Sequence, residues 1–127
     1  MHIDQVDWQP LLTCASDTKA SAVRKMLDRH NADSILLTDG GLVIGCLDRA
    51  DLDRPELIAG AAGANDPIGT FAHACTFHAA PDMDAGLVLD KMRRRRLPVV
   101  PVKQNGKIVG MISQSAIESG YAHGSTS

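Results

Sequence analysis

Aromatic residues are scarce in this sequence. One tryptophan, one tyrosine and two phenylalanines make up 3% of its 127 residues. Proteins that hold single-stranded nucleic acid usually stack the bases on aromatic side chains, so that function is disfavoured. The net charge of −2 also gives no general basic surface for nucleic acid. The sequence therefore predicts no nucleic-acid partner.

Membrane and export signals are also missing. No apolar run is long enough to span a bilayer, and residues 1–10 lack the apolar core of a signal peptide. The three cysteines, Cys14, Cys46 and Cys75, are odd in number and show no CxxC spacing, so no complete disulfide framework is expected. Such cysteines fit a reducing compartment. We expect a cytoplasmic protein without membrane contact.

Catalytic motifs are missing as well. No nucleophile stands at a recognised spacing from a base, and there is no phosphate-binding P-loop. We therefore expect neither enzyme activity nor a cofactor. His73, Cys75 and His78 form an H-x-C-x-x-H pattern, but in a strand His78 falls on the opposite face and a fourth ligand is lacking. A metal site is not predicted, and a metal or redox sensor is the least favoured alternative.

What the chain does contain is an internal repeat. Shifted by 65 positions, residues 12–52 align with 77–117 without a gap. Ordinary composition predicts roughly two or three identities over such a length. Seven are found: Ala15/Ala80, Asp17/Asp82, Ala20/Ala85, Val23/Val88, Arg29/Arg94, Gly41/Gly106 and Gly45/Gly110. The match predicts the same small α/β unit twice.

Each copy predicts the element order β-α-β-β-α. The first helix should begin at a capping carboxylate, Asp17 or Asp82, and each hairpin should turn at the glycines near 40–41 or 105–106. Buried helix faces are expected at Ala20, Val23, Leu27, Ala85, Val88, Leu89 and Met92. The expected first strands lie near 11–15 and 75–79, the hairpins within 34–46 and 98–112, and the second helices near 49–59 and 114–121.

The repeats set the expected domain organisation. The first repeat, with an N-terminal segment, occupies 1–66 and ends in a linker at 60–66. The second repeat occupies 67–121, and 122–127 form a frayed tail. One copy alone would bury too little surface to be stable, so we expect both copies to pack as one pseudo-two-fold unit.

This order, present twice, resembles the CBS domain pair, named for cystathionine β-synthase. The second copy carries the closer likeness, through residues 81–82, 97–100, 105–107 and 108–113. The first copy is similar at 16–17, 39–41 and 43–51. The resemblance implies two clefts between the repeats, homodimer formation and binding of adenine nucleotides or related adenosine compounds. Because the chain has no room for an effector domain, it implies a free-standing module that signals to an unknown partner protein.

The family's ligand signature resembles Gly-h-h-[Ser/Thr]-x-x-Asp, where h is apolar. Its hydroxyl contacts phosphate at a helix start, where an anion is favoured, and its Asp accepts two hydrogen bonds from the ribose hydroxyls. The first copy keeps Asp51 but has Asp48 at the hydroxyl position. The second copy keeps Ser113 but has Ala116 at the carboxylate position. Asp48 and Ser113 have an alternative role as helix caps.

Other positions are ligand candidates through the same resemblance. Thr13 and His78 lie at equivalent strand ends, which face the cleft in the family. Leu97, Pro98 and Val99 match the segment that lines the adenine pocket. Apart from the resemblance, the arginines of the run 93–96 point in different directions around a helix, so one of them, Arg95, is the candidate to reach a phosphate. The alternatives are an exposed histidine, a buried hairpin strand and a solvated helix end.

The sequence therefore predicts a ligand-sensing regulatory module. The ligand belongs to the AMP, ADP, ATP, NAD or S-adenosylmethionine class. The main alternative is a ligand-free module for dimerisation or partner docking. Homodimerisation is expected through helix residues such as Val23, Leu27, Leu87 and Ile117.

Overall fold

A computed structural model of the protein describes residues 1–57 and 62–124. The chain forms two compact units, and each contains one repeat. The first-repeat unit consists of Leu12–Thr76. The second-repeat unit combines Met1–Leu11 with the chain from Phe77 onward. No helix within the described ranges is long and apolar enough to cross a lipid bilayer.

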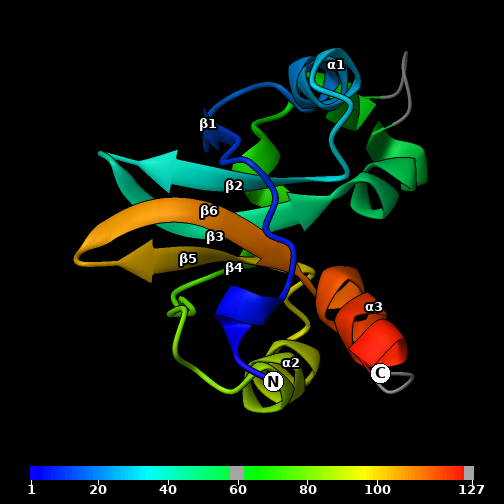
Figure 1. Ribbon diagram of the computed structural model, residues 1–127. Coiled ribbons are helices and arrows are strands. Elements are labelled where there is room, and N and C mark those ends of the chain that lie inside the picture. The colour runs from blue at the N-terminus through cyan, green and yellow to red at the C-terminus, as the bar shows by residue number, and fades with distance from the viewer. Residues whose placement is uncertain (58–61, 125–127) are drawn as a thin grey trace. The chain divides into compact units, whose positions relative to one another are not determined.

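The first-repeat unit is a four-stranded sheet with one helix on a face (Figure 1). The strand order is β1 (Thr13–Ala15), β2 (Ser34–Asp39), β3 (Leu42–Asp48) and β4 (His73–Ala74), with α1 (Ala20–Arg29) against it. Strand β1 is parallel to β2, and the other neighbours are antiparallel. The expected helix face is buried in a core with side chains from the strands, among them Val23, Leu27, Ile35, Leu37 and Leu47.

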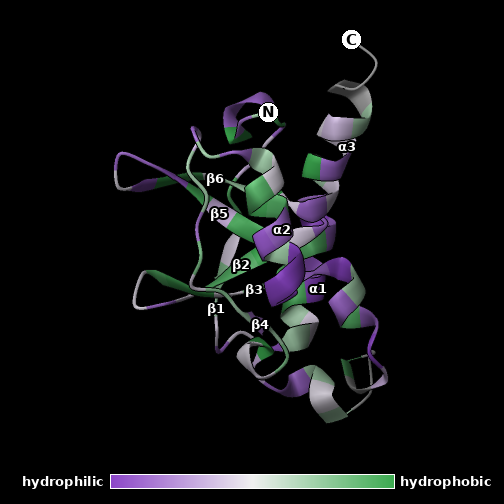
Figure 2. Ribbon diagram, turned by 90° about the horizontal axis from the view of Figure 1, so that it is seen from below, coloured by the Kyte–Doolittle hydropathy of each residue, from purple (hydrophilic) through white to green (hydrophobic). Residues whose placement is uncertain are grey.

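The second-repeat unit has the same hairpin and helix. Its elements are α2 (Ala85–Arg95), β5 (Val99–Gln104), β6 (Lys107–Ser113) and α3 (Gln114–Gly124). Ser34 pairs with Asp48 and Val99 with Ser113, and the register shifts after Leu37 and after Val102. Both correspondences follow the shift of 65, so the repeat is confirmed at the level of single residue pairs. Figure 2 shows hydrophobic residues along the strands, while α1 and α2 carry both hydrophobic and hydrophilic residues.

The expected hairpin turns are confirmed. Gly40 and Gly41 have φ angles of 57° and 85°, and Asn105 and Gly106 have 54° and 79°. Two successive positive φ angles give a tight turn that matches the twist of the flanking strands.

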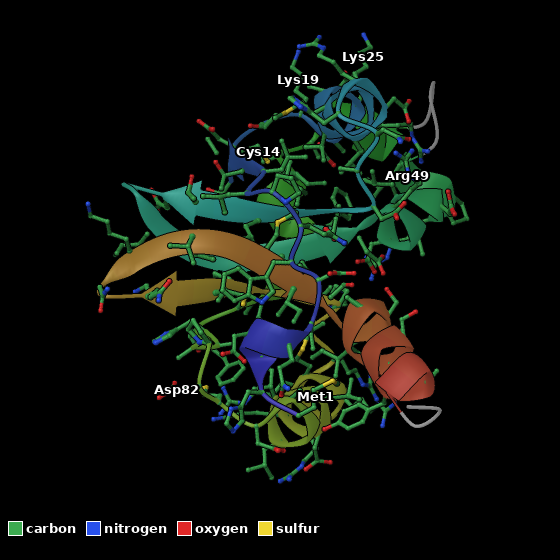
Figure 3. The ribbon with its side chains drawn as sticks, viewed as in Figure 1. Met1, Cys14, Lys19, Lys25, Arg49 and Asp82 are labelled. Carbon is green, nitrogen blue, oxygen red and sulfur yellow. The ribbon has the colours of Figure 1, made fainter. Side chains whose placement is uncertain are left out.

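The predicted helix caps are wrong. Helix α1 begins at Ala20 after Lys19, and α2 begins at Ala85 after Asp84. Figure 3 shows Asp82 in the loop ahead of α2 and Lys19 at the start of α1. Both helices start two residues later than predicted because Lys19 and Asp84 each form a β-bridge first. The Asp84 carboxylate then caps α2 by accepting a hydrogen bond from the Leu87 N–H at 3.0 Å.

The strand predicted near 75–79 is reduced to one bridge between Ala79 and Val102. Two prolines explain the loss. In the first repeat, β1 is joined to β2 by hydrogen bonds from the Leu36 N–H to the Leu12 carbonyl and from the Ser16 N–H to the Thr38 carbonyl. The corresponding positions in the second repeat are Pro101 and Pro81, which have no N–H to donate.

The second helix also differs between the copies. The helix expected near 114–121 is confirmed as α3, which continues to Gly124, so residues 122–124 are helical rather than a tail. In the first repeat, the described part of the segment 49–59 forms two short 3-10 helices, η2 (Arg49–Asp53) and η3 (Pro55–Leu57). Pro55 disfavours helical geometry at Arg54, which is extended with ψ 140°. Residues 58–61 and 125–127 lie outside the described residues.

The segment before each repeat packs in the unit of the other repeat. The 3-10 helix η5 (Ile68–Thr70) belongs to the first-repeat unit, and η1 (Ile3–Gln5) belongs to the second-repeat unit. Ile68 and Ile3 are fully buried there. The Asp66 carbonyl accepts from the Ala20 N–H at 3.1 Å, and the Met1 carbonyl accepts from the Ala85 N–H at 2.7 Å. These bonds satisfy N–H groups that a helix start leaves unpaired.

The expected linker therefore contributes to the fold. Within it, η4 (Ala62–Asn65) is a 3-10 helix in which Gly63 and Ala64 are buried. Asp66 then supplies the carbonyl at the start of α1. The sequence repeat boundary near residue 66 and the boundary of the compact units at Thr76 thus fall at different places.

Candidate functional site

Asp48 and Asp51 form a reciprocal capping box where β3 ends. The Asp48 Oδ1 accepts from the Asp51 N–H at 3.0 Å, and the Asp51 Oδ2 accepts from the Asp48 N–H at 3.0 Å. Asp48 is extended, with φ −112° and ψ 171°, and η2 begins at the next residue. The capping role considered for Asp48 is therefore present, and it also fixes the position of the Asp51 carboxylate.

The second carboxylate oxygen of Asp51 contacts a histidine side chain from a distant part of the unit. His73 lies in β4 and pairs with Cys46 of β3. Its Nε2 is 3.0 Å from the Asp51 Oδ1, and both side chains are only partly buried. Strands β3 and β4 with the helix η2 thus bring together three groups, which we call the Asp48–Asp51–His73 cluster.

The two carboxyl groups of the cluster have opposite pKa shifts. Burial raises the pKa of Asp48, and the negative charge of Asp51 adds to that increase. Burial also acts to raise the pKa of Asp51, but hydrogen bonds from the Asp48 N–H and from His73 outweigh it, so the pKa of Asp51 falls below 3.8. Asp51 is thus the better stabilised carboxylate at neutral pH.

The second-repeat unit has a counterpart of the cluster with different chemistry. Ser113 and Ala116 correspond to Asp48 and Asp51 by the shift of 65. The Ser113 Oγ accepts from the Ala116 N–H at 3.1 Å and lies 3.1 Å from the Ser115 Oγ. Gln9 corresponds to His73, because it pairs with Met111 as His73 pairs with Cys46. The capping role considered for Ser113 is present here too.

Four of the predicted ligand residues lie together in the second-repeat unit. Val99 pairs with Ser113, and the Gln114 N–H donates to the Pro98 carbonyl at 3.1 Å. The Gln114 side chain also donates to the Leu97 carbonyl at 2.8 Å. Leu97, Val99 and Ser113 are buried, while Pro98 is partly exposed.

The remaining candidates lie apart from these groups. Thr13 is exposed, and β2 and β3 separate it from His73 in the same row of the sheet, a distance of about 14 Å at ordinary strand spacing. His78 is exposed and precedes the bridge at Ala79. Arg95 is exposed at the end of α2, where two neighbouring arginines form ion pairs with Glu118 and Asp90.

No metal site is found in the part of the chain that the structure describes. There, no group of three or more His, Cys, Asp or Glu side chains is arranged to hold a metal ion. Of the H-x-C-x-x-H pattern, His73 contacts Asp51, Cys75 is buried, and His78 belongs to the other compact unit.

Sequence reasoning did not connect His73 with Asp51. The two residues are 22 positions apart. The segment 71–74 aligns with the N-terminal segment only after a change of shift from 65 to 64, because Gln9 and not Trp8 is the counterpart of His73. The close approach of Gly45 to the His73 carbonyl and of Gly110 to the Gln9 carbonyl, both 3.1 Å from an added Cβ, marks this correspondence in the structure.

Comparisons with known proteins agree with this fold. The protein-family model "CBS domain" matches residues 76–120. The chain is similar to an A-adding tRNA nucleotidyltransferase of Geobacter sulfurreducens, with 26% identity over 84% of the chain, but it spans only 12% of that relative.

Two solved structures show the likeness in three dimensions. The CBS domain pair of protein MJ0100, described in complex with 5′-methylthioadenosine and S-adenosyl-L-methionine, has a TM-score of 0.76 and 20% identity, and 98% of each chain is covered. A hexameric CBS-CP12 protein from bloom-forming cyanobacteria has a TM-score of 0.76 and 14% identity, with 93% of this chain and 69% of that chain covered. The second repeat is therefore a CBS domain, and the chain has the fold of a CBS-domain pair.

Proposed function

We propose that the chain is a regulatory module that binds the adenosine part of a small molecule at the Asp48–Asp51–His73 cluster. The observation that carries the proposal is the environment of the Asp51 carboxylate. Each of its oxygens is oriented by one hydrogen bond, one from the Asp48 N–H and one with His73. A carboxylate has about four lone-pair sites, so acceptor capacity is left for the two hydroxyls of a ribose.

The charge of the cluster favours one part of the predicted ligand class. Asp48 stands where the family signature has a hydroxyl, directly beside Asp51. Two carboxylates at this point repel a phosphate. We therefore expect a neutral or cationic group next to the ribose, as in 5′-methylthioadenosine or S-adenosyl-L-methionine, in preference to AMP, ADP, ATP or NAD. The relative described with these two compounds supports this choice.

A second binding position is proposed in the second-repeat unit. Pro98, flanked by Leu97 and Val99, offers a partly exposed apolar contact for adenine. Ser113 is the proposed phosphate contact, and the exposed His78 and Arg95 add positive charge or hydrogen-bond donors. Because the Ser113 hydroxyl already caps α3, we expect this position to bind more weakly than the cluster. Thr13 in the first-repeat unit has only its strand-end position as support.

Homodimerisation is proposed through one face of α2. Of the helix residues expected at the interface, Val23, Leu27 and Ile117 are fully buried within their units and are unavailable for this role. Leu87, by contrast, is 72% exposed. It lies in a groove of about 380 Å³ together with Phe77, Met83, Asp84, Val88 and Lys91.

The groove is suited to a second copy of the chain. Asp84 and Lys91 lie seven residues apart, two helical turns, on either side of Leu87. If two α2 helices cross in antiparallel orientation near Leu87, each Asp84 faces the Lys91 of the other copy. The hexameric relative shows that this fold occurs in oligomers. Dimerisation without a ligand is the second candidate function, and the exposed Leu87 is the observation that favours it.

We propose that the regulated partner is an effector protein. A cytoplasmic location stays a prediction, supported by the three cysteines, which carry no disulfide.

A thermal-shift panel tests the proposed function. The compounds are adenosine, 5′-methylthioadenosine, S-adenosyl-L-methionine, AMP, ATP and NAD, each with the purified full chain. Compounds without phosphate should raise the melting temperature most, because a ligand that binds only the folded state stabilises it. No shift with any compound, together with a stable dimer in sedimentation, would replace this function with the ligand-free alternative.

A further inference from the structure

His73 contacts the Asp51 carboxylate, although it lies outside the family's ligand signature. The signature places Asp51 three residues after Asp48 in one continuous segment, whereas His73 reaches the carboxylate from β4, which precedes the other repeat. Its side chain is 29% exposed. A ligand on Asp51 would therefore share its acceptor with an imidazole.

We propose that His73 is a positioning residue, which holds the Asp51 carboxylate in place to accept hydrogen bonds from ribose. The inference rests on the proposed function of the cluster. The Nε2 of His73 donates one hydrogen bond to Oδ1 and leaves the second lone pair of that oxygen available.

The groups around His73 support this role. Asp51 contacts the ring, and Asp48 is hydrogen-bonded to Asp51. On β3, the residue paired with His73 is Cys46, a buried thiol, and Cys75 beyond β4 is also buried. The hydrogen bond with His73 helps to lower the pKa of Asp51, so it stabilises the ionised carboxylate that ribose would need.

The second-repeat unit carries a natural contrast. There the position of His73 is occupied by Gln9 and that of Asp51 by Ala116. The histidine and the carboxylate are thus present together in one unit and replaced together in the other. A histidine needed only to pair β4 with β3 would not require Asp51, because that pairing uses backbone groups.

Calorimetry with two probes tests the role of His73. Adenosine carries the vicinal diol, and 2′,3′-dideoxyadenosine lacks it. At pH 7.5, His73→Ala should weaken adenosine binding about fivefold, the effect of one lost neutral hydrogen bond, and leave dideoxyadenosine binding unchanged.

Two variants serve as controls. His73→Gln keeps a side-chain donor, so it should restore most of the adenosine affinity lost in His73→Ala. His30→Gln removes an exposed histidine at the end of α1 and should bind adenosine as the parent does. Far-UV circular dichroism establishes that each variant is folded, and His73→Phe, which fills the space without a donor, carries the test if His73→Ala does not fold.

The outcomes separate this inference from the proposed function. If the parent binds adenosine but His73→Ala binds it equally well, or His73→Ala weakens both probes equally, the positioning role is overturned while the proposed function stands. If the parent binds neither probe at any pH, the proposed function fails and the role of His73 fails with it.

Discussion

The first-repeat and second-repeat units begin the segment after their hairpins with the same hydrogen bond but with different side chains. A carboxylate oxygen of Asp48 accepts from the N–H three residues ahead, and the Ser113 hydroxyl does the same. The position at the end of the hairpin is therefore explained by capping in both units. The residue three positions later, Asp51 or Ala116, and the residue that pairs with the second hairpin strand, His73 or Gln9, make the units chemically different.

The largest expected effects concern the two segments, residues 1–11 and 66–76, that each pack in the unit of the other repeat. Ile3→Ala and Ile68→Ala should each lower the free energy of unfolding by about 2–5 kcal/mol, because each removes a fully buried side chain. In both cases the side chain is buried in the unit of the repeat that does not directly follow it in the sequence. Urea denaturation measures both. Leu42→Ala, at a side chain that is 71% exposed, is the control and should cost less than about 0.5 kcal/mol. Equal small effects for all three variants would show that these segments are not part of the folded units.

A second pair of variants tests the close approach of β4 and of Gln9. A Cβ at Gly45 or Gly110 would lie 3.1 Å from the His73 or Gln9 carbonyl oxygen. Gly45→Ala and Gly110→Ala should each destabilise the protein by about 1–3 kcal/mol, as overpacking does. Thermal unfolding provides the measurement. A loss at one glycine only would mean that the two units are less alike at this point than their geometry indicates.

The charge difference between the units predicts a change in ligand preference. Asp48→Thr removes a carboxylate beside Asp51 and keeps a capping oxygen. AMP binding should strengthen by about tenfold or less, the range of an interaction between partly exposed charges, while adenosine binding changes little. Calorimetry with both compounds checks this. An equal gain for adenosine and AMP would contradict the proposed repulsion of phosphate.

The smallest effects concern stability and pH. The raised pKa of Asp48 means that its ionisation destabilises the fold, so the stability it contributes is lost as pH rises through the folded-state pKa. The lowered pKa of Asp51 contributes stability above 3.8, which is lost as pH falls through the folded-state pKa. At pH 7, Asp48→Asn should stabilise and Asp51→Asn should destabilise, each by at most about 1 kcal/mol because the site is open to solvent.

Urea denaturation at pH 7 and at pH 3 distinguishes the two signs. Both differences should shrink toward zero at the lower pH, where the carboxyl groups gain protons. Two variants that change stability in the same direction at pH 7 would contradict the assignment of the ionised carboxylate to Asp51.

Local sequence signals predicted much of the fold and part of the site. The hairpins and the buried helix faces follow from glycine positions and apolar spacing, and they agree with the structure at single-residue level. The second helix predicted for the first repeat near 49–59 is replaced, in its described part, by two short 3-10 helices because Pro55 interrupts the segment. Asp48 and Asp51 lie in one short motif and could be found together.

What could not be predicted depends on contacts between distant segments. The helix starts are decided by bridges to residues 2 and 67, which pattern alone does not reveal. The sequence did not predict that the segment before each repeat packs in the unit of the other repeat, because residues 1–9 and 66–74 share little sequence beyond Ile3 and Ile68. For the same reason, the contact of His73 with Asp51 could not be read from either residue's neighbours.

Binding of ribose by the Asp51 carboxylate is tested by calorimetry of adenosine binding to the parent, Asp51→Ala and Ala116→Asp. A hydrogen-bonded carboxylate contributes about 1.5–3 kcal/mol, so Asp51→Ala should weaken binding by about tenfold or more while its circular dichroism spectrum is unchanged. Ala116→Asp restores a carboxylate in the second-repeat unit and should add a second, weaker binding event. Adenosine binding by Asp51→Ala with the parent's affinity would contradict the claim.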